Sequence, residues 1–304
     1  MMSDNLRGAS WIVASSISAT IMTIGIRALT PEIHSLQITS VRSVVGMIIL
    51  LPLLLPRSGL NLATNRIGLH ILRGVIGVIS INCGYYSLTV LPLVTATALF
   101  FTTPLFVIAL APVMLGESVG WRRWTATLIG FTGTIMVVRH NPTGFDFATF
   151  TAVTASVLFA LQLLIGKRLS VTERPTTIMF YFNVVLLGFS LPPAVTVWAW
   201  PTGGQLLLLT GVGVFASART YFDIRGYASG EASFVAPFQY TRMIFMGVAG
   251  FILFAEIPRT SLLLGASLIV LCTLYIAERE ARTRRGTGPL LHQPDDEVVP
   301  PSAR

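Results

Sequence analysis

Two stretches of this sequence decide the predicted fold: SLTVLPLVTATALFFTTPLFVIALAPVMLGE, from Ser87 to Glu117, and GYASGEASFVAPFQYTRMIFMGVAGFILFAE, from Gly226 to Glu256. When the first residues of the two stretches are aligned, each stretch is an apolar run that ends at a single glutamate, and another apolar segment follows. Few residues are identical. The shared layout nevertheless predicts an internal duplication.

The composition shows that water is not the solvent of this chain. Of 304 residues, 53% are hydrophobic and 11% are charged, and the mean hydropathy is +0.73, whereas a soluble domain has about 25% charged residues. No charged residue lies between Arg73 and Glu117 or between Arg174 and Arg219. Each gap is long enough for roughly two helical crossings of a bilayer. We therefore expect an all-α polytopic membrane protein.

Prolines, glycines and polar residues divide the apolar sequence into ten predicted transmembrane helices. In chain order these helices are 9–29, 36–55, 69–91, 93–115, 121–138, 147–169, 176–198, 205–225, 232–255 and 260–277. They form two predicted five-helix repeats, 9–138 and 147–277. Residues 278–304 are polar and rich in Arg, Pro and Asp, so we expect a disordered cytoplasmic tail.

An odd number of helices in each repeat requires the second repeat to be inverted in the membrane relative to the first. With a cytoplasmic N-terminus, the inner face receives most Lys and Arg residues, including the pairs 122–123 and 167–168, and the outer face receives only Arg27, Arg139 and Arg259. The positive-inside rule thus predicts that both termini are cytoplasmic. This orientation also explains the basic composition without nucleic-acid binding. Inverted repeats are typical of transporters that expose a midplane site alternately to each side.

Both halves carry short motifs in the same order. The first half has Pro-Leu-Phe-Val at 104–107, Leu-Gly-Glu at 115–117 and Gly130; the second has Tyr-Ala at 227–228, Glu-Ala-Ser at 231–233, Ala-Pro-Phe at 236–238, Tyr240 and Glu256. With these motifs the sequence resembles the EamA type of the drug/metabolite transporter superfamily, over residues 9 to 278. The Gly-Trp-Arg-Arg-Trp loop at 120–124 is similar to that of a branch that includes riboflavin and S-adenosylmethionine uptake proteins. Arg242 departs from the commoner pattern, in which an apolar residue or Ser is more frequent.

The resemblance implies a secondary transporter of the bacterial inner membrane that moves a small organic metabolite by alternating access, as a monomer or homodimer. Its substrate would be flavin- or nucleoside-like, or amino-acid-like. Export of amino acids or drugs by the same fold is an alternative. A membrane-embedded enzyme or a non-transporting partner protein is the alternative from another class.

Four ionisable side chains stand out because they lie away from the ends of predicted helices: Arg42, Arg219, Asp223 and Arg242. A charge at the centre of a bilayer costs roughly 2.5–3.5 kcal/mol and marks a candidate functional residue. Arg219 and Asp223 are four residues apart on one helical face, so we predict that they pair, either as a structural ion pair or as a cytoplasmic gate. Arg242 has no acid within four residues. It is predicted to bind an anionic or carbonyl group of the substrate, or carbonyls of a broken helix, and Arg42 has the same two interpretations.

Polar and aromatic side chains are predicted to complete a substrate site around Arg242. The predicted substrate-binding residues are Arg242, Tyr240, Gln239, Tyr86, Asn82, Phe101, Gln162, Tyr181, Asn183 and Arg42. An aromatic-lined pocket with a few amides suits a flat, partly polar metabolite, although packing between helices explains the same residues. Pro104 and Pro237 interrupt two helices near this site and are candidate hinges.

The sequence gives no reason to expect a cofactor, a metal site or an enzyme. It contains no Gly-rich phosphate loop, so ATP is not expected to be the direct energy source. Cys83, Cys272 and the four histidines are dispersed, without the spacing of metal ligands. Glu117 and Glu256 are expected to be structural caps at opposite faces. The pair Gly74 and Gly77 is expected to allow close packing of helices.

Overall fold

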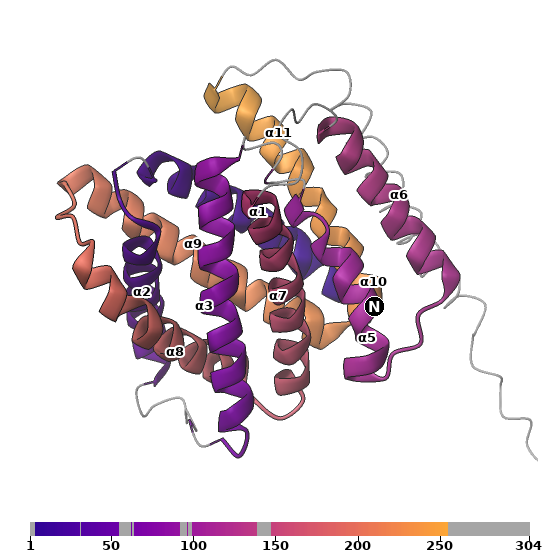
Figure 1. Cartoon of the computed structure of the whole chain (residues 1–304). Helices are drawn as coiled ribbons and strands as arrows, with labels where there is room; N and C mark the ends of the chain where they lie inside the picture. The colour runs from indigo at the N-terminus through magenta and orange to yellow at the C-terminus, as the bar shows by residue number, and fades with distance from the viewer. Residues whose placement is uncertain are drawn as a thin grey trace, which may run out of the picture.

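The computed structural model describes residues 4–30, 32–54, 62, 64–91, 96, 99–138 and 147–254, and all regular secondary structure among these residues is helical (Figure 1). The first half contains α1 (Asp4–Leu29), α2 (Ser35–Leu54), α3 (Ile67–Val90), α5 (Thr103–Leu115) and α6 (Trp121–Val138). The second half contains α7 (Phe147–Ser170), α8 (Pro175–Thr196), α9 (Gly203–Ser229), α10 (Ala232–Val235), the 3₁₀ helix η2 (Ala236–Tyr240) and α11 (Thr241–Phe254). The predicted tenth helix, Glu256 and the tail lie outside the described residues.

Five of the described helices are long and apolar enough to cross a bilayer: α1, α2, α3, α7 and α8. The chain is therefore a multi-pass membrane protein. The 27-residue α9 is long enough but less apolar, because it contains Arg219, Asp223 and Arg225. Helix α5, with 13 residues, is apolar but shorter than these five helices.

Two predicted helices are not continuous in the structure. The predicted helix 93–115 is interrupted by a turn at residues 101–102, after which α5 begins with Pro104 in its first turn. The predicted helix 232–255 is divided into α10, η2 and α11. Pro237 lies in η2, where its missing N–H and its ring are incompatible with a regular α-helical turn. The interruptions expected at these two prolines are thus present.

Helices of the two halves are intercalated. The most extensive contacts join α1 to α9, α3 to α7 and α2 to α8, and Figure 1 shows α3 beside α7. Each of these pairs combines one helix from each half. A space between such pairs is consequently lined by both halves of the chain.

Two buried apolar clusters lie at different positions along the lengths of α1 and α9. One contains Ile12 of α1 and Tyr227 of α9, together with Val107 and Phe234. The other contains Met22, Ile26 and Leu29 of α1 with Leu209, Val212 and Ala216 of α9. The polar positions between them, such as Ser15 on α1 and Arg219 on α9, face the site described below.

Small residues allow α3 and α8 to approach closely, as expected for Gly74 and Gly77. A Cβ atom on Gly74 would lie 2.5 Å from Cβ of Val185, and one on Gly77 would lie 2.5 Å from the ring of Phe182. Gly74 cannot accept a methyl group without movement of α8, because Cβ of Val185 is fixed to its backbone, whereas a methyl group at Gly77 would displace the Phe182 ring. The two glycines therefore set the distance between these helices.

We predict that Gly74→Ala lowers the melting temperature of the detergent-purified protein, since overpacking costs about 1–3 kcal/mol. Gly188→Ala, on α8, is the matched control because no atom lies within 4 Å of its added Cβ. The control should be neutral or stabilising, by up to about 1 kcal/mol, because alanine favours helix more than glycine does. Differential scanning fluorimetry of both variants provides the measurement. A Gly74→Ala variant at least as stable as the control would contradict the close approach.

Candidate functional site

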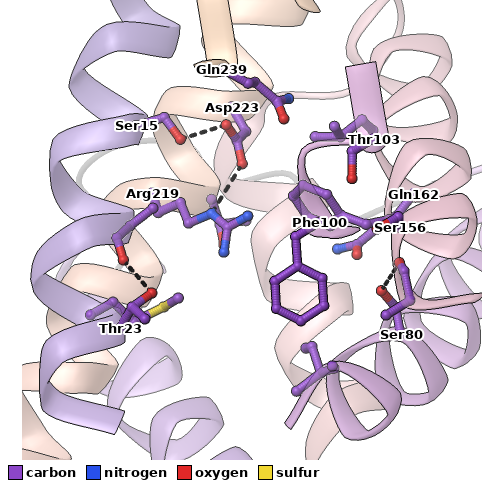
Figure 2. A pocket seen from close by; sticks show the side chains of 18 of the residues that line it. Ser15, Thr23, Ser80, Phe100, Thr103, Ser156, Gln162, Arg219, Asp223 and Gln239 are labelled. Carbon is purple, nitrogen blue, oxygen red and sulfur yellow. Dashed lines mark hydrogen bonds and ion pairs between the residues drawn. The ribbon is translucent and has the colours of Figure 1, made fainter. Parts of the chain in front are cut away.

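A cavity of about 150 Å³ lies between helices of both halves (Figure 2). Its walls are formed by α1, α2, α3, the start of α5, α7, α8, α9, η2 and α11. On α1 the lining runs from Ser15 to Ile26, and on α9 it runs from Arg219 to Asp223. The cavity thus lies part-way along both helices, between the two apolar clusters.

Small polar residues of α1 form one wall of this cavity. Ser15, Ser16 and Thr23 line it, and Thr23 Oγ1 donates a hydrogen bond to the Ala19 carbonyl at 2.8 Å. Such a bond within the helix satisfies the O–H donor of threonine in an apolar environment. The hydroxyl oxygen can still accept a hydrogen bond from another group. Helix α1 therefore supplies acceptors without filling the space.

The predicted pair of Arg219 and Asp223 is present. Arg219 Nε lies 3.7 Å from Asp223 Oδ2, and Ser15 Oγ donates to Asp223 Oδ1 at 2.5 Å. Figure 2 shows Ser15 and Arg219 directed toward this carboxylate from different helices. The Arg219 guanidinium also lies 4.7 Å from the ring centre of Phe159. Asp223 consequently connects α9 to α1 and neutralises Arg219.

Arg242 enters the cavity from the first turn of α11, immediately after the helix interruption. Its Nη2 donates to Thr23 Oγ1 at 2.6 Å, and its Nε is buried without a hydrogen-bond partner in the described part of the chain. Gln239 of η2 also lines the cavity and donates from Nε2 to the Tyr227 hydroxyl at 2.8 Å. The interruption at Pro237 is therefore what brings these two side chains to the site.

Arg73 is a cavity residue that the sequence did not single out as functional. It is 3% exposed, its Nε donates to the Gln162 carbonyl at 3.3 Å, and its guanidinium lies 4.6 Å from the ring centre of Phe182. Near the predicted start of a helix, an arginine is ordinarily an interface residue. Helical spacing was the available signal, because Arg73, Ser80 and Gly84 share one face of α3 and all line the cavity.

The cavity brings together seven of the predicted binding and gating residues. These are Arg242, Gln239, Phe101, Gln162, Arg42, Arg219 and Asp223. They come from α2, α7, α9, η2, α11 and the turn before α5, which the sequence alone could not place side by side. Of the two candidate hinges, Pro104 follows the lining residue Thr103 and Pro237 precedes Gln239.

The remaining five predicted binding residues do not line this cavity. The Tyr240 hydroxyl donates to the Thr127 carbonyl at 3.4 Å, the Asn82 amide to Val78 at 2.9 Å and the Tyr181 hydroxyl to Leu62 at 2.8 Å. Asn183 packs against Gly46 of α2. Tyr86 is 43% exposed with its ring against Phe147. Its neighbour Tyr85 lines the cavity instead, because consecutive helical residues point about 100° apart.

A second polar cluster fixes the start of α10, and we call it the α10 cap cluster: Glu117, Lys167, Arg123, Glu231 and Ser233. Glu117 Oε1 accepts hydrogen bonds from Lys167 Nζ at 2.6 Å and from the Ala232 N–H at 2.9 Å. Its Oε2 accepts from the Ser233 N–H at 3.1 Å. Arg123 forms an ion pair with Glu231 and donates to Ser233 Oγ. Glu117 is thus a cap, as expected, but of a helix far away in the sequence.

The contacts of Glu117 determine its charge state. Burial alone would raise the pKa of this carboxyl, but the hydrogen bonds from Lys167, Ala232 and Ser233 and the charge of Lys167 outweigh burial and lower the pKa below its ordinary value. Glu117 therefore stays ionised at neutral pH.

In the described ranges, no three His, Cys, Asp or Glu side chains are grouped so as to hold a metal ion.

The comparisons with known proteins agree with this architecture. The family model described as the EamA-like transporter family matches residues 6–139. The chain is 30% identical to the S-adenosylmethionine uptake transporter of Rickettsia felis over 92% of this chain and 96% of that protein. It is also 30% identical to the riboflavin transporter of Vibrio cholerae, again over 92% of this chain and 96% of the relative.

The fold is also found in a solved structure. The crystal structure of another protein superposes on this chain with a TM-score of 0.75 at 16% sequence identity. The superposition covers 91% of this chain and 99% of the other chain. The predicted resemblance is confirmed, and with it the expectation of a transporter rather than an enzyme. The chain belongs to the EamA-like transporter family, within the drug/metabolite transporter superfamily.

Proposed function

We propose that this protein is a secondary transporter that moves a small organic metabolite across the bacterial inner membrane by alternating access. The cavity lined by both halves of the chain carries the proposal. Two buried apolar clusters flank it along α1 and α9. Separation of one cluster at a time would open the cavity to one side of the membrane and then to the other.

The proposed topology consists of ten helices in two inverted repeats, 9–138 and 147–277, followed by a cytoplasmic tail at 278–304. Both termini are cytoplasmic in this arrangement, because it places most Lys and Arg residues on the inner face. The transporter works as a monomer or homodimer and needs no nucleic-acid partner. In this scheme the pair of Arg219 and Asp223 is a gate, and Pro104 and Pro237 are hinges.

The proposed substrate is a flavin- or nucleoside-like metabolite, with an amino-acid-like metabolite as the second candidate. Aromatic rings of Tyr85, Phe100, Phe101, Phe159 and Phe182 line the cavity and suit a flat ring system. The names of the two relatives favour the first candidate, because flavins and S-adenosylmethionine both contain a fused heterocycle. Substrate contacts are assigned to Arg242, Gln239, Phe101, Gln162 and Arg42, which all line the cavity.

Uptake into proteoliposomes tests this function. The purified protein should take up at least one radiolabelled member of a panel containing riboflavin, flavin mononucleotide, S-adenosylmethionine and phenylalanine. Uptake should saturate, and preloaded substrate should accelerate it by exchange. Protein-free liposomes are the control. Flux that does not saturate would indicate a channel, and a complete absence of flux and binding would contradict the proposed function.

A further inference from the structure

We infer that the cavity selects an organic anion and that Arg73 and Arg242 are the residues that bind its negatively charged oxygens. This inference rests on the proposed function and narrows its substrate class. The cavity is lined by four arginines, Arg42, Arg73, Arg219 and Arg242, and Asp223 is the only acid among the lining residues that the structure describes. Arginine is not deprotonated in proteins. The formal charge of the described lining residues, four arginines and one aspartate, is thus +3.

The one carboxylate among the described lining residues is already engaged. Asp223 pairs with Arg219 through Oδ2 and accepts the Ser15 hydroxyl at Oδ1. No described acid pairs with Arg73 or Arg242. Their guanidinium groups keep two buried nitrogens, Nη1 of Arg73 and Nε of Arg242, without hydrogen-bond partners among the described residues.

Each of these nitrogens can donate a hydrogen bond to a bound ligand. An uncompensated buried charge costs several kcal/mol, and a buried donor without a partner adds a desolvation penalty. The two arginines belong to different halves, α3 and α11, and both line the cavity, so an anion bound in the cavity would be attracted by both. Carboxylates and phosphates match the planar donor fork of arginine.

The surroundings of each arginine hold its donors in place. The Arg73 guanidinium lies over the Phe182 ring and is tied to the Gln162 carbonyl. Arg242 is held by Thr23. Both groups are therefore positioned before a ligand arrives, which lowers the entropic cost of binding. Phe100 and Phe101 provide apolar surface for the rest of the ligand, so the expected ligand is an aromatic ring system that bears a carboxylate or a phosphate.

Matched ligand pairs that differ in one anionic group provide the test. Flavin mononucleotide is compared with riboflavin, and N-acetylphenylalanine with N-acetylphenylalaninamide, by isothermal titration calorimetry on the full chain in detergent. In at least one pair, the anion should bind about tenfold more tightly or better, in keeping with a charge-assisted hydrogen bond. The first pair reports a phosphate and the second a carboxylate. The preferred anion should also be taken up by proteoliposomes.

Variants assign the preference to the two arginines. Arg73→Gln and Arg242→Gln should each weaken binding of the preferred anion about tenfold or more and leave its uncharged partner unaffected. Arg73→Lys keeps the charge but not the fork, so its affinity for the preferred anion should fall between those of wild type and Arg73→Gln. If the glutamine variant folds poorly, the lysine variant should still bind the preferred anion more weakly than wild type does. Arg7→Gln, at an exposed position near the start of α1, is the control and should retain the full preference.

The outcomes separate this inference from the proposed function. Saturable transport of an uncharged or cationic panel member, with no preference for the anion of either pair, would overturn the inference and leave the transporter intact. An anion preference that survives both glutamine variants would overturn the assignment to Arg73 and Arg242. If the folded wild type neither binds nor transports any panel member, both proposals fail.

Discussion

Replacing Asp223 with alanine is expected to abolish transport and to lower the melting temperature of the purified protein more than any other single change proposed here. The variant leaves Arg219 without its carboxylate partner and Ser15 without its acceptor. Removing one partner of a buried ion pair costs about 3–5 kcal/mol, because the remaining charge is uncompensated. The loss should be visible in differential scanning fluorimetry, and transport should be measured at a temperature at which the variant is still folded.

A double variant separates stability from transport. Arg219→Met combined with Asp223→Leu removes both charges and fills the space with apolar side chains, and such replacements of buried ion pairs are often neutral or stabilising. The double variant should therefore melt close to wild type and still fail to transport, because its gate no longer has two charge-dependent states. Wild-type uptake by this variant would show that the pair is only structural. A single Asp223→Ala variant with unchanged stability would contradict its role in joining α1 to α9.

The sequence predicted which residues are unusual better than it predicted where they point. Charge placement identified Arg42, Arg219, Asp223 and Arg242, and the spacing of four residues predicted a pair that the structure contains. These predictions follow from depth in the membrane and from helical periodicity, both of which are local properties. The same reasoning anticipated close packing at Gly74, although the partner Val185 is more than a hundred positions away and could not be named.

Predictions that depended on the orientation of a side chain were less successful. Tyr86 is among the predicted binding residues and Tyr85 is not, yet of these two tyrosines only Tyr85 lines the cavity. The rotation of a helix about its axis is fixed by its neighbours. In a helix that is apolar on all sides, the sequence gives little indication of which side faces the cavity. Arg73 was missed for a related reason. Its position near a helix end suggested the interface, and only the packing of α3 against α7 and α8 places it in the cavity.

Glu117→Gln is expected to have the second large effect, at a site well separated in the chain from the cavity arginines. The variant retains the shape of the side chain and removes its charge, so Lys167 loses its ionised partner and the N–H groups of Ala232 and Ser233 lose a charged acceptor. Charge-assisted hydrogen bonds contribute about 1.5–3 kcal/mol each to stability. The melting temperature should fall at neutral pH. Transport should fall too, because the start of α10 positions η2 and, through it, Gln239 and Arg242.

The pH dependence of this effect has a definite sign. Because the pKa of Glu117 is lower in the folded protein than its ordinary value of 4.5, ionisation of Glu117 stabilises the fold above about pH 4.5, and this stabilisation is lost as the pH falls through the folded pKa. The difference in melting temperature between wild type and Glu117→Gln should thus be constant from pH 8 to pH 5 and shrink only below that range. Glu32→Gln is the matched control, since Glu32 is exposed and accepts a hydrogen bond from Gln205, and exposed contacts contribute little. A gap that shrinks already between pH 7 and pH 5 would mean that Glu117 binds a proton in that range, which would contradict its role as the ionised cap of α10.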